Sequence, residues 1–377
     1  MMSVKQYVSK SSISVGESKS RDETGIHQYA QILQEKGFVV IPREVVGFHE
    51  SEIEDLYNAQ LQQARKQFGD DWFDAGVEWT KSSKKRWGKS GTAGKVNAFA
   101  EQYKLFIDQR VNRLFDYMFE ALRIQRDSDT NLIKILGSRL SLNNAWRTSR
   151  KQAGLTPHVD ENPWSNQSPN ERYDYEFWKS KVNSDIEHAR LKLRPRERYK
   201  PIASFLALTD CVGGCDGGGM GCSTCRDAFS YYQKSHNHGR NKYQDDSTRS
   251  LKQVKKYYKQ EEIDPTKPLP KTIMAPDTYK EYQKKDKEIW RKMVYPEYKK
   301  GDIVMWLSET FHAGPKNNTS EAVQSRMYIG MLPDCVLNRQ FVQRQWNKLD
   351  DANRTFIINN FTQEQRRRFG ENADTEE

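Results

Sequence analysis

The chain has 377 residues, of which 36% are hydrophobic; this is lean but sufficient for a globular core. Its 61 Lys and Arg residues exceed its 51 Asp and Glu residues, giving a net charge of +10. No window holds the roughly 18 consecutive apolar residues of a membrane helix. Residues 1–25 also lack the apolar run of a secretory signal. We therefore predict a protein with no membrane partner in a reducing compartment such as the cytoplasm.

The N-terminal region predicts a disordered segment followed by a helix and a strand. Residues 1–25 are rich in Ser, Lys and Glu and are predicted to be disordered, although an organelle-targeting sequence stays open. Residues 29–42 predict a helix, a stop at Gly37 and a first strand, and a second helix is expected from about 50 to 67. We expect one domain over residues 26–340, then a C-terminal helix and an acidic tail over 341–377.

A candidate metal site begins at residues 157–160, which read Pro-His-Val-Asp. In a strand, side chains at i and i+2 lie on one face, so His158 and Asp160 could bind one ion. Residues 303–307 form a continuous apolar run after a Gly-Asp turn and predict a buried strand that leads to His312. Two histidines and one carboxylate are the ligands typical of non-haem Fe(II) oxygenases. The alternative for His158 is a loop histidine that hydrogen-bonds to backbone.

Arg326 begins a second apolar segment, residues 326–331, in which it is the only charged residue. A buried arginine is costly unless an anion meets it, and its planar guanidinium suits a carboxylate bound through two hydrogen bonds. Arg326 is therefore a candidate anchor for an acidic cosubstrate. The structural alternative is a salt bridge to an acidic residue of the protein.

These motifs resemble the phytanoyl-CoA hydroxylase-like branch of the Fe(II)/2-oxoglutarate-dependent dioxygenases. The segment 29–42 is similar to the opening helix and strand of that family, and 202–210 is similar to its core strand. Residues 217–220 resemble its Gly-Gly turn, and Ser-His at 235–236 stands where the family often has Gly-Ser-His. The resemblance covers about residues 26–335, discontinuously and in the correct order.

The resemblance implies a mainly β fold with flanking helices, built on a double-stranded β-helix, which is a jelly-roll or cupin-like core. It implies Fe(II) bound by His158, Asp160 and His312, and 2-oxoglutarate bound by Arg326 with Phe205 packed beside it. The reaction would consume dioxygen and release succinate and CO2 while oxidising a C–H bond of the substrate. Hydroxylation, desaturation and oxidative cyclisation share this ligand set.

The glycine-rich segment after residue 210 departs from the family because it contains four cysteines, Cys211, Cys215, Cys222 and Cys225. Four thiolates can form a structural zinc site, although the first spacing is wider than usual. Reduced, partly buried thiols and a redox disulfide are the alternatives. The total of five cysteines is odd and does not suggest a secreted disulfide framework.

The distance from Asp160 to His312 in the sequence is long for the family and predicts an insertion, placed at about residues 227–300. Residues 251–300 contain fourteen Lys and Arg against eight Asp and Glu, with six tyrosines. Interspersed charges and several prolines favour a lid over the site. A nucleic-acid or protein docking surface is the alternative, since lysines contact phosphates and aromatic rings stack on bases.

Candidate substrate-binding residues flank the first ligand pair: Arg147 could bind a carboxylate, and Trp146 and Trp164 could line an apolar pocket. We therefore predict a small, acidic metabolite such as an amino acid or other carboxylic acid as the substrate. A protein or nucleic-acid hydroxylase or demethylase that uses the basic insertion is the second hypothesis. A non-catalytic metal-binding module is the third.

Overall fold

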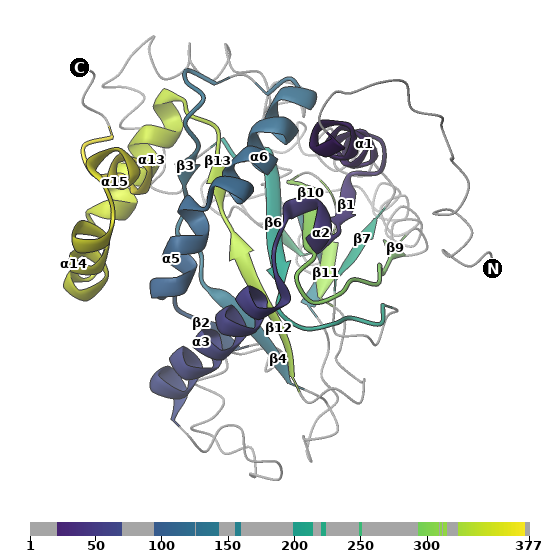
Figure 1. Ribbon diagram of the computed structural model, residues 1–377, viewed down its shortest axis with the longest axis horizontal. Coiled ribbons are helices and arrows are strands. Elements are labelled where there is room, and N and C mark those ends of the chain that lie inside the picture. The colour runs from purple at the N-terminus through teal and green to yellow at the C-terminus, as the bar shows by residue number, and fades with distance from the viewer. Residues whose placement is uncertain are drawn as a thin grey trace, which may run out of the picture.

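The structure is a computed structural model. It describes residues 21–69, 94–124, 126–142, 155–159, 199–213, 220–223, 249–250, 293–308, 310, 312–314 and 323–373. The helices of this part of the chain are α1 (Arg21–Lys36), α2 (Arg43–Val46), α3 (Glu50–Phe68), α5 (Ala100–Ile107), α6 (Gln109–Ala121), α13 (Val336–Trp346), α14 (Asp351–Asn360) and α15 (Gln363–Phe369). They lie around a central layer of strands (Figure 1).

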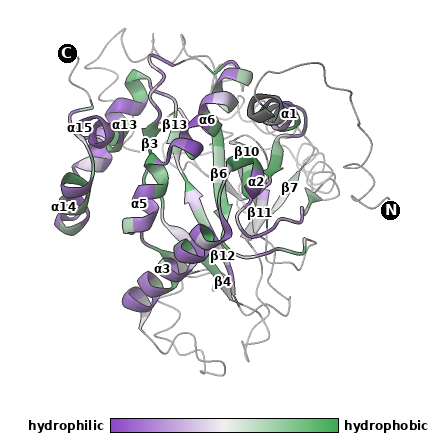
Figure 2. Ribbon diagram, viewed as in Figure 1, coloured by the Kyte–Doolittle hydropathy of each residue, from purple (hydrophilic) through white to green (hydrophobic). Residues whose placement is uncertain are grey.

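The larger sheet has six antiparallel strands in the order β1-β10-β6-β12-β4-β2. Their bounds are β1 (Phe38–Ile41), β2 (Gly94–Val96), β4 (Ser138–Leu142), β6 (Ile202–Ala207), β10 (Ile303–Leu307) and β12 (Val323–Ile329). Every residue of β6 and β10 is buried, as their continuous apolar sequences predict for central strands covered on both faces. Figure 2 shows both strands as mainly hydrophobic.

The smaller sheet has five antiparallel strands in the order β8-β5-β11-β7-β9, and β3 pairs with β13 apart from both sheets. Their bounds are β3 (Leu132–Ile133), β5 (Leu155–Val159), β7 (Gly221–Ser223), β8 (Arg249–Ser250), β9 (Met293–Val294), β11 (His312–Gly314) and β13 (Met331–Leu332). From β4 to β12 the chain passes from one sheet to the other at every step except between β7, β8 and β9. This alternation is the strand order that a double-stranded β-helix requires. The antiparallel sheets and flanking helices are confirmed, whereas closure into a jelly roll stays a prediction.

The two faces of the larger sheet bury different side chains. Leu206, Met305 and Met327 belong to the main core, which also contains the inward sides of α1, α5, α6 and α13. Phe205 and Val304 alternate with them along the strands and belong to a second cluster on the opposite face. Helices α3, α5 and α6 lie over one side of the sheet in Figure 1, so the second cluster occupies the face turned away from them.

Both ends of the domain differ from the prediction. Helix α1 begins at Arg21, so residues 21–25 are helical rather than disordered. The C-terminal region has three helices, α13 to α15, and the first begins at Val336 rather than within 341–377. Arg368 on α15 is partly buried, and its guanidinium donates to the carbonyl oxygens of Asn131 and Phe106. Burial lowers the pKa of Arg368 to about 10.

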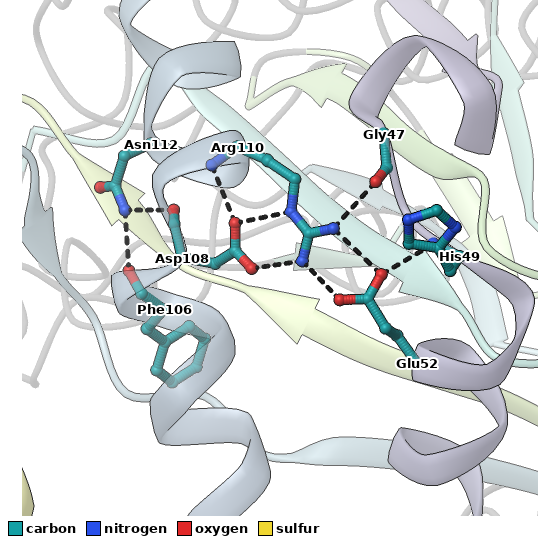
Figure 3. Close-up of polar contacts among 7 residues, drawn as sticks. All are labelled: Gly47, His49, Glu52, Phe106, Asp108, Arg110 and Asn112. Atoms are coloured by element: carbon teal, nitrogen blue, oxygen red, sulfur yellow. Dashed lines mark hydrogen bonds and ion pairs between the residues drawn. The ribbon is translucent and has the colours of Figure 1, made fainter.

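An ion-pair network joins the start of α3 to the link between α5 and α6 (Figure 3). The Arg110 guanidinium donates to both carboxylate oxygens of Glu52, at 3.0 and 2.8 Å, and to both of Asp108. It also donates to the Gly47 carbonyl oxygen at 2.8 Å. Glu52 in turn accepts from the backbone N–H of His49 at the start of α3. Hydrogen bonds from Arg110 are the largest cause of a Glu52 pKa of about 2.

This network predicts that Glu52→Gln lowers the free energy of unfolding at pH 7 by about 1 kcal/mol, the upper end for partly exposed pairs. Because the folded-state pKa of Glu52 is depressed, its contribution is complete above the ordinary carboxyl pKa. The difference between wild type and variant should therefore shrink as the pH falls from about 4.5 towards 2. Urea unfolding of both proteins at several pH values in this range measures the difference in the free energy of unfolding. Asp55→Asn, at an exposed position of the same helix, is the control and should show no such pH-dependent difference.

Candidate functional site

The two candidate histidines lie side by side in the smaller sheet. Strands β11 and β5 pair antiparallel with His312 opposite His158. Residues directly opposite in an antiparallel pair lie on the same face of the sheet. The structure therefore brings together, through backbone pairing, two residues that are 154 positions apart in the sequence. Asp160 lies outside the described residues.

The His312 imidazole is buried, with 6% of the residue exposed. Its Nδ1 lies 3.0 Å from the carbonyl oxygen of Thr310. A neutral ring in this arrangement carries its proton on Nδ1, which leaves the lone pair on Nε2, the form in which imidazole binds a metal. The indole of Trp306 lies against the ring, with centroids 5.1 Å apart. These contacts fix the orientation of His312.

Thr310 is in turn fixed by the turn between α1 and β1. Its hydroxyl donates to the Gly37 carbonyl oxygen at 2.9 Å. Gly37 has a φ of +80°, and a Cβ at this position would lie only 2.6 Å from the Thr310 hydroxyl oxygen. Both observations require glycine. The glycine stop after the first helix thus also positions the segment that leads to His312.

Arg326 projects from β12 into the second cluster. The residue is 7% exposed, and its guanidinium carbon lies 5.5 Å from the centroid of the Phe205 ring. β12 pairs with β6, where Arg326 is opposite Ala207. Phe205 is fully buried. The structure thus brings together the two residues predicted to hold the cosubstrate.

Aromatic rings connect the histidine to the arginine. The Phe205 ring packs against Trp306, with centroids 6.0 Å apart, and Trp306 contacts His312. Tyr298 and Tyr328 also pack on Phe205 with edge-to-face geometry. Burial raises the pKa of Tyr298, while the positive charge of Arg326 acts in the opposite direction. His312 and Arg326 therefore face one largely apolar interior.

Tyr298 and Tyr328 were not predicted from the sequence as residues of the site. Tyr298 was included in the insertion at 227–300, but it is buried, and its backbone forms a bridge with Cys211. Strand β9 at 293–294 likewise belongs to the smaller sheet. The insertion therefore ends before residue 293. Tyr328 could have been found from the period of two, since it is two residues after Arg326 on the same strand.

Two of the four clustered cysteines are described. Cys211 and Cys222 are buried and form no disulfide. Cys222 lies opposite His312 in the pairing of β7 with β11, and burial raises the pKa of its thiol. Cys215 and Cys225 lie outside the described residues, so the zinc site stays a prediction. Within the described ranges, no group of three or more His, Cys, Asp or Glu residues could bind a metal ion.

The candidate substrate residues Trp146, Arg147 and Trp164 also lie outside the described residues. The same holds for residues 251–292 of the basic insertion. Among the helices that the structure describes, none is long and apolar enough to cross a membrane. No curated protein matches this sequence.

The C-terminal part of the chain is similar to a known protein family. Residues 248–372 match the Gig2-like family. This region contains β8 to β13 and the three C-terminal helices, and therefore includes His312 and Arg326.

The chain is similar to three solved structures. A protein from Salmonella typhimurium LT2, provisionally assigned as an oxidoreductase, is 12% identical with a TM-score of 0.53, covering 91% of this chain and 82% of that one. GIG2 (DUF1479) from Candida albicans is 15% identical with a TM-score of 0.49, covering 91% and 76%. The epimerase SnoN of nogalamycin biosynthesis, solved with Fe3+ and alpha ketoglutarate, is 15% identical with a TM-score of 0.41, covering 83% and 85%.

The contact between Gly37 and Thr310 predicts that Gly37→Ala lowers the free energy of unfolding by about 1–3 kcal/mol. The variant would place a Cβ in the left-handed region and against the Thr310 hydroxyl. Gly25→Ala is the matched control because Gly25 lies on α1 with nothing within 4 Å of an added Cβ. Gly25→Ala should be neutral or stabilising, as alanine is the better helix former. Equal effects of the two substitutions in urea unfolding would contradict this account.

Proposed function

We propose that this protein is an Fe(II)- and 2-oxoglutarate-dependent oxygenase that oxidises a C–H bond of a small, acidic metabolite. One observation carries the proposal: the Trp306 and Phe205 rings connect His312, whose strand pairs with that of His158, to the buried Arg326. The similarity to a protein provisionally assigned as an oxidoreductase supports the enzyme class. The family resemblance of the motifs supports the reaction type.

The residues fit the proposed metal. Two imidazoles and the carboxylate of Asp160, two residues after His158, would leave coordination positions open for a chelating cosubstrate and dioxygen. The Thr310 carbonyl oxygen would hold His312 in the tautomer that binds through Nε2. Bound iron would supply the activation of dioxygen, coupled to the conversion of 2-oxoglutarate to succinate and CO2.

The residues of this chain would bind, orient and shield the reactants. Arg326 would pair with the distal carboxylate of 2-oxoglutarate, and Phe205 would pack against the methylene carbons. Trp306, Tyr298 and Tyr328 would exclude water from the reacting centre. Arg147, Trp146 and Trp164 are proposed to line the substrate site. Hydroxylation, desaturation or ring closure would then depend on how the substrate is held.

The first experiment is an anaerobic titration of the metal-free protein with Fe(II) and then with 2-oxoglutarate. The visible charge-transfer band of the chelate is the signal that is monitored. We expect the band in wild type and its loss in His158→Ala and His312→Ala. His27→Ala is the control, since His27 is an exposed residue of α1 whose ring lies edge-to-face with Tyr117. A folded wild-type protein without the band would overturn the proposal in favour of a non-catalytic module.

Arg326→Gln should raise the Kd of 2-oxoglutarate roughly 10- to 100-fold, corresponding to the loss of about 1.5–3 kcal/mol in charge-assisted hydrogen bonds. Fe(II) affinity should stay near wild type because Arg326 is not a ligand. Arg326→Lys keeps the positive charge without the planar guanidinium, so its Kd for 2-oxoglutarate should lie between those of wild type and Arg326→Gln. Isothermal titration of the Fe(II) protein under anaerobic conditions measures all three. Unchanged cosubstrate affinity in Arg326→Gln would show that the arginine serves only the fold.

A further inference from the structure

Two buried polar groups at the end of β10 have no hydrogen-bond partner in the part of the chain that the structure describes. They are the indole Nε1 of Trp306 and the side-chain hydroxyl of Ser308. Trp306 is 3% exposed and Ser308 is fully buried. A buried polar group without a partner has lost its hydrogen bond to water and gained none in return, which is costly. Such a group in a native fold calls for an explanation, and a bound ligand is one.

Both groups lie on the face of the larger sheet that carries Phe205. Trp306 belongs with Phe205 to the second cluster, whereas the next residue, Leu307, belongs to the main core. The ladder continues beyond β10, because the Ser308 N–H donates to the Pro201 carbonyl oxygen at 2.9 Å. Side chains alternate along an extended chain. Ser308, two residues after Trp306, is therefore on the same face as the indole.

The neighbouring strands offer the indole no acceptor. In the register of the sheet, Trp306 lies between Phe38 of β1 and Ala203 of β6, and both of these side chains are apolar. The carbonyl oxygens beside it are engaged in the ladder, because β10 is paired on both sides. Tryptophan can donate a hydrogen bond but cannot accept one. Its N–H therefore requires an acceptor from outside these strands.

The position of Trp306 indicates where such an acceptor would lie. Its ring packs against His312, with centroids 5.1 Å apart. Arg326 is further along the sheet: it lies opposite Ala207 of β6, whereas Trp306 lies opposite Ala203 of the same strand. A ligand oxygen that meets the indole N–H would therefore be at the His312 end of the interior, away from the arginine.

We propose that the Trp306 indole N–H and the Ser308 hydroxyl donate hydrogen bonds to a carboxylate oxygen of a ligand bound at the His312 end of this interior. The inference rests on the proposed function, in which that end holds the metal, and deepens it by naming the groups that orient the ligand there. Two carboxylates have the required chemistry: the C1 carboxylate of 2-oxoglutarate and the acid group of the primary substrate. Hydrogen bonds to a charged acceptor are the strong ones, so both residues would favour an acidic ligand.

The test observes the indole N–H directly by NMR. Protein isotope-labelled at the tryptophan indole nitrogens is saturated with diamagnetic Zn(II), and the Trp306 signal is the one absent from the spectrum of Trp306→Phe. The first probe is 2-oxopentanoate, a 2-oxo acid without the distal carboxylate that Arg326 would bind. The second probe is acetate, added after saturation with 2-oxoglutarate. A downfield shift of the Trp306 proton with 2-oxopentanoate would identify the C1 carboxylate as the acceptor. A shift with acetate alone would identify the acid group of the substrate.

Probe affinity is the second readout. The Kd of the probe that moves the Trp306 signal should rise roughly tenfold in Trp306→Phe and about threefold in Ser308→Ala. Trp346→Phe is the matched control for loss of a buried indole, since Trp346 lies on α13 in the main core. Ser138→Ala is the control for loss of a buried hydroxyl without a partner, because Ser138 lies opposite Met327 on the helix-covered face. Both controls should keep the wild-type Kd.

The outcomes separate this inference from the proposed function. If wild type binds 2-oxoglutarate but neither probe moves the Trp306 signal, the proposed function stands and the inference is overturned. Equal Kd values in wild type and Trp306→Phe would also overturn it, because a change in ring current would then explain the shift. If wild type binds no 2-oxoglutarate, yet acetate moves the signal and binds more weakly to Trp306→Phe, the proposed function fails and the carboxylate site stands. If Trp306→Phe does not fold, Ser308→Ala decides, and an unchanged Kd in that variant overturns the inference.

Discussion

The register of β11 is the constraint on which the candidate site depends. Side chains alternate along a strand, so a slip of one residue would move His312 to the opposite face and separate it from His158. β11 is only three residues long and has few ladder bonds of its own to prevent such a slip. Its register is secured from outside the strand, by the central strand β10 and by the Thr310 hydroxyl bonded to Gly37. The N-terminal turn therefore takes part in the site although it contributes no ligand.

The same alternation in the larger sheet puts the residues of the helix-covered core on one face and the candidate cosubstrate residues on the other. On β6 and β12, Leu206 and Met327 pack into the core beneath the helices, whereas Phe205 and Arg326 face the other way. A guanidinium in the helical core would carry a large desolvation cost. On the other face the Arg326 guanidinium lies over the Phe205 ring, and Arg326 is opposite Ala207 in the pairing of β12 with β6. The fold can thus place a buried cation without disturbing the packing that holds the sheet.

The elements with strong periodic patterns could be predicted from the sequence. The apolar run 303–307 and the core strand beginning at residue 202 are strands, and the pairing of His158 with His312 is consistent with the motif analysis. The helical start at Arg21 was missed because the polar residues of that turn lack a hydrophobic period. The partial burial of Arg368 could not be predicted from the sequence, because a run of three arginines is usually solvated. Its burial depends on carbonyl oxygens of Phe106 and Asn131, which are distant in sequence.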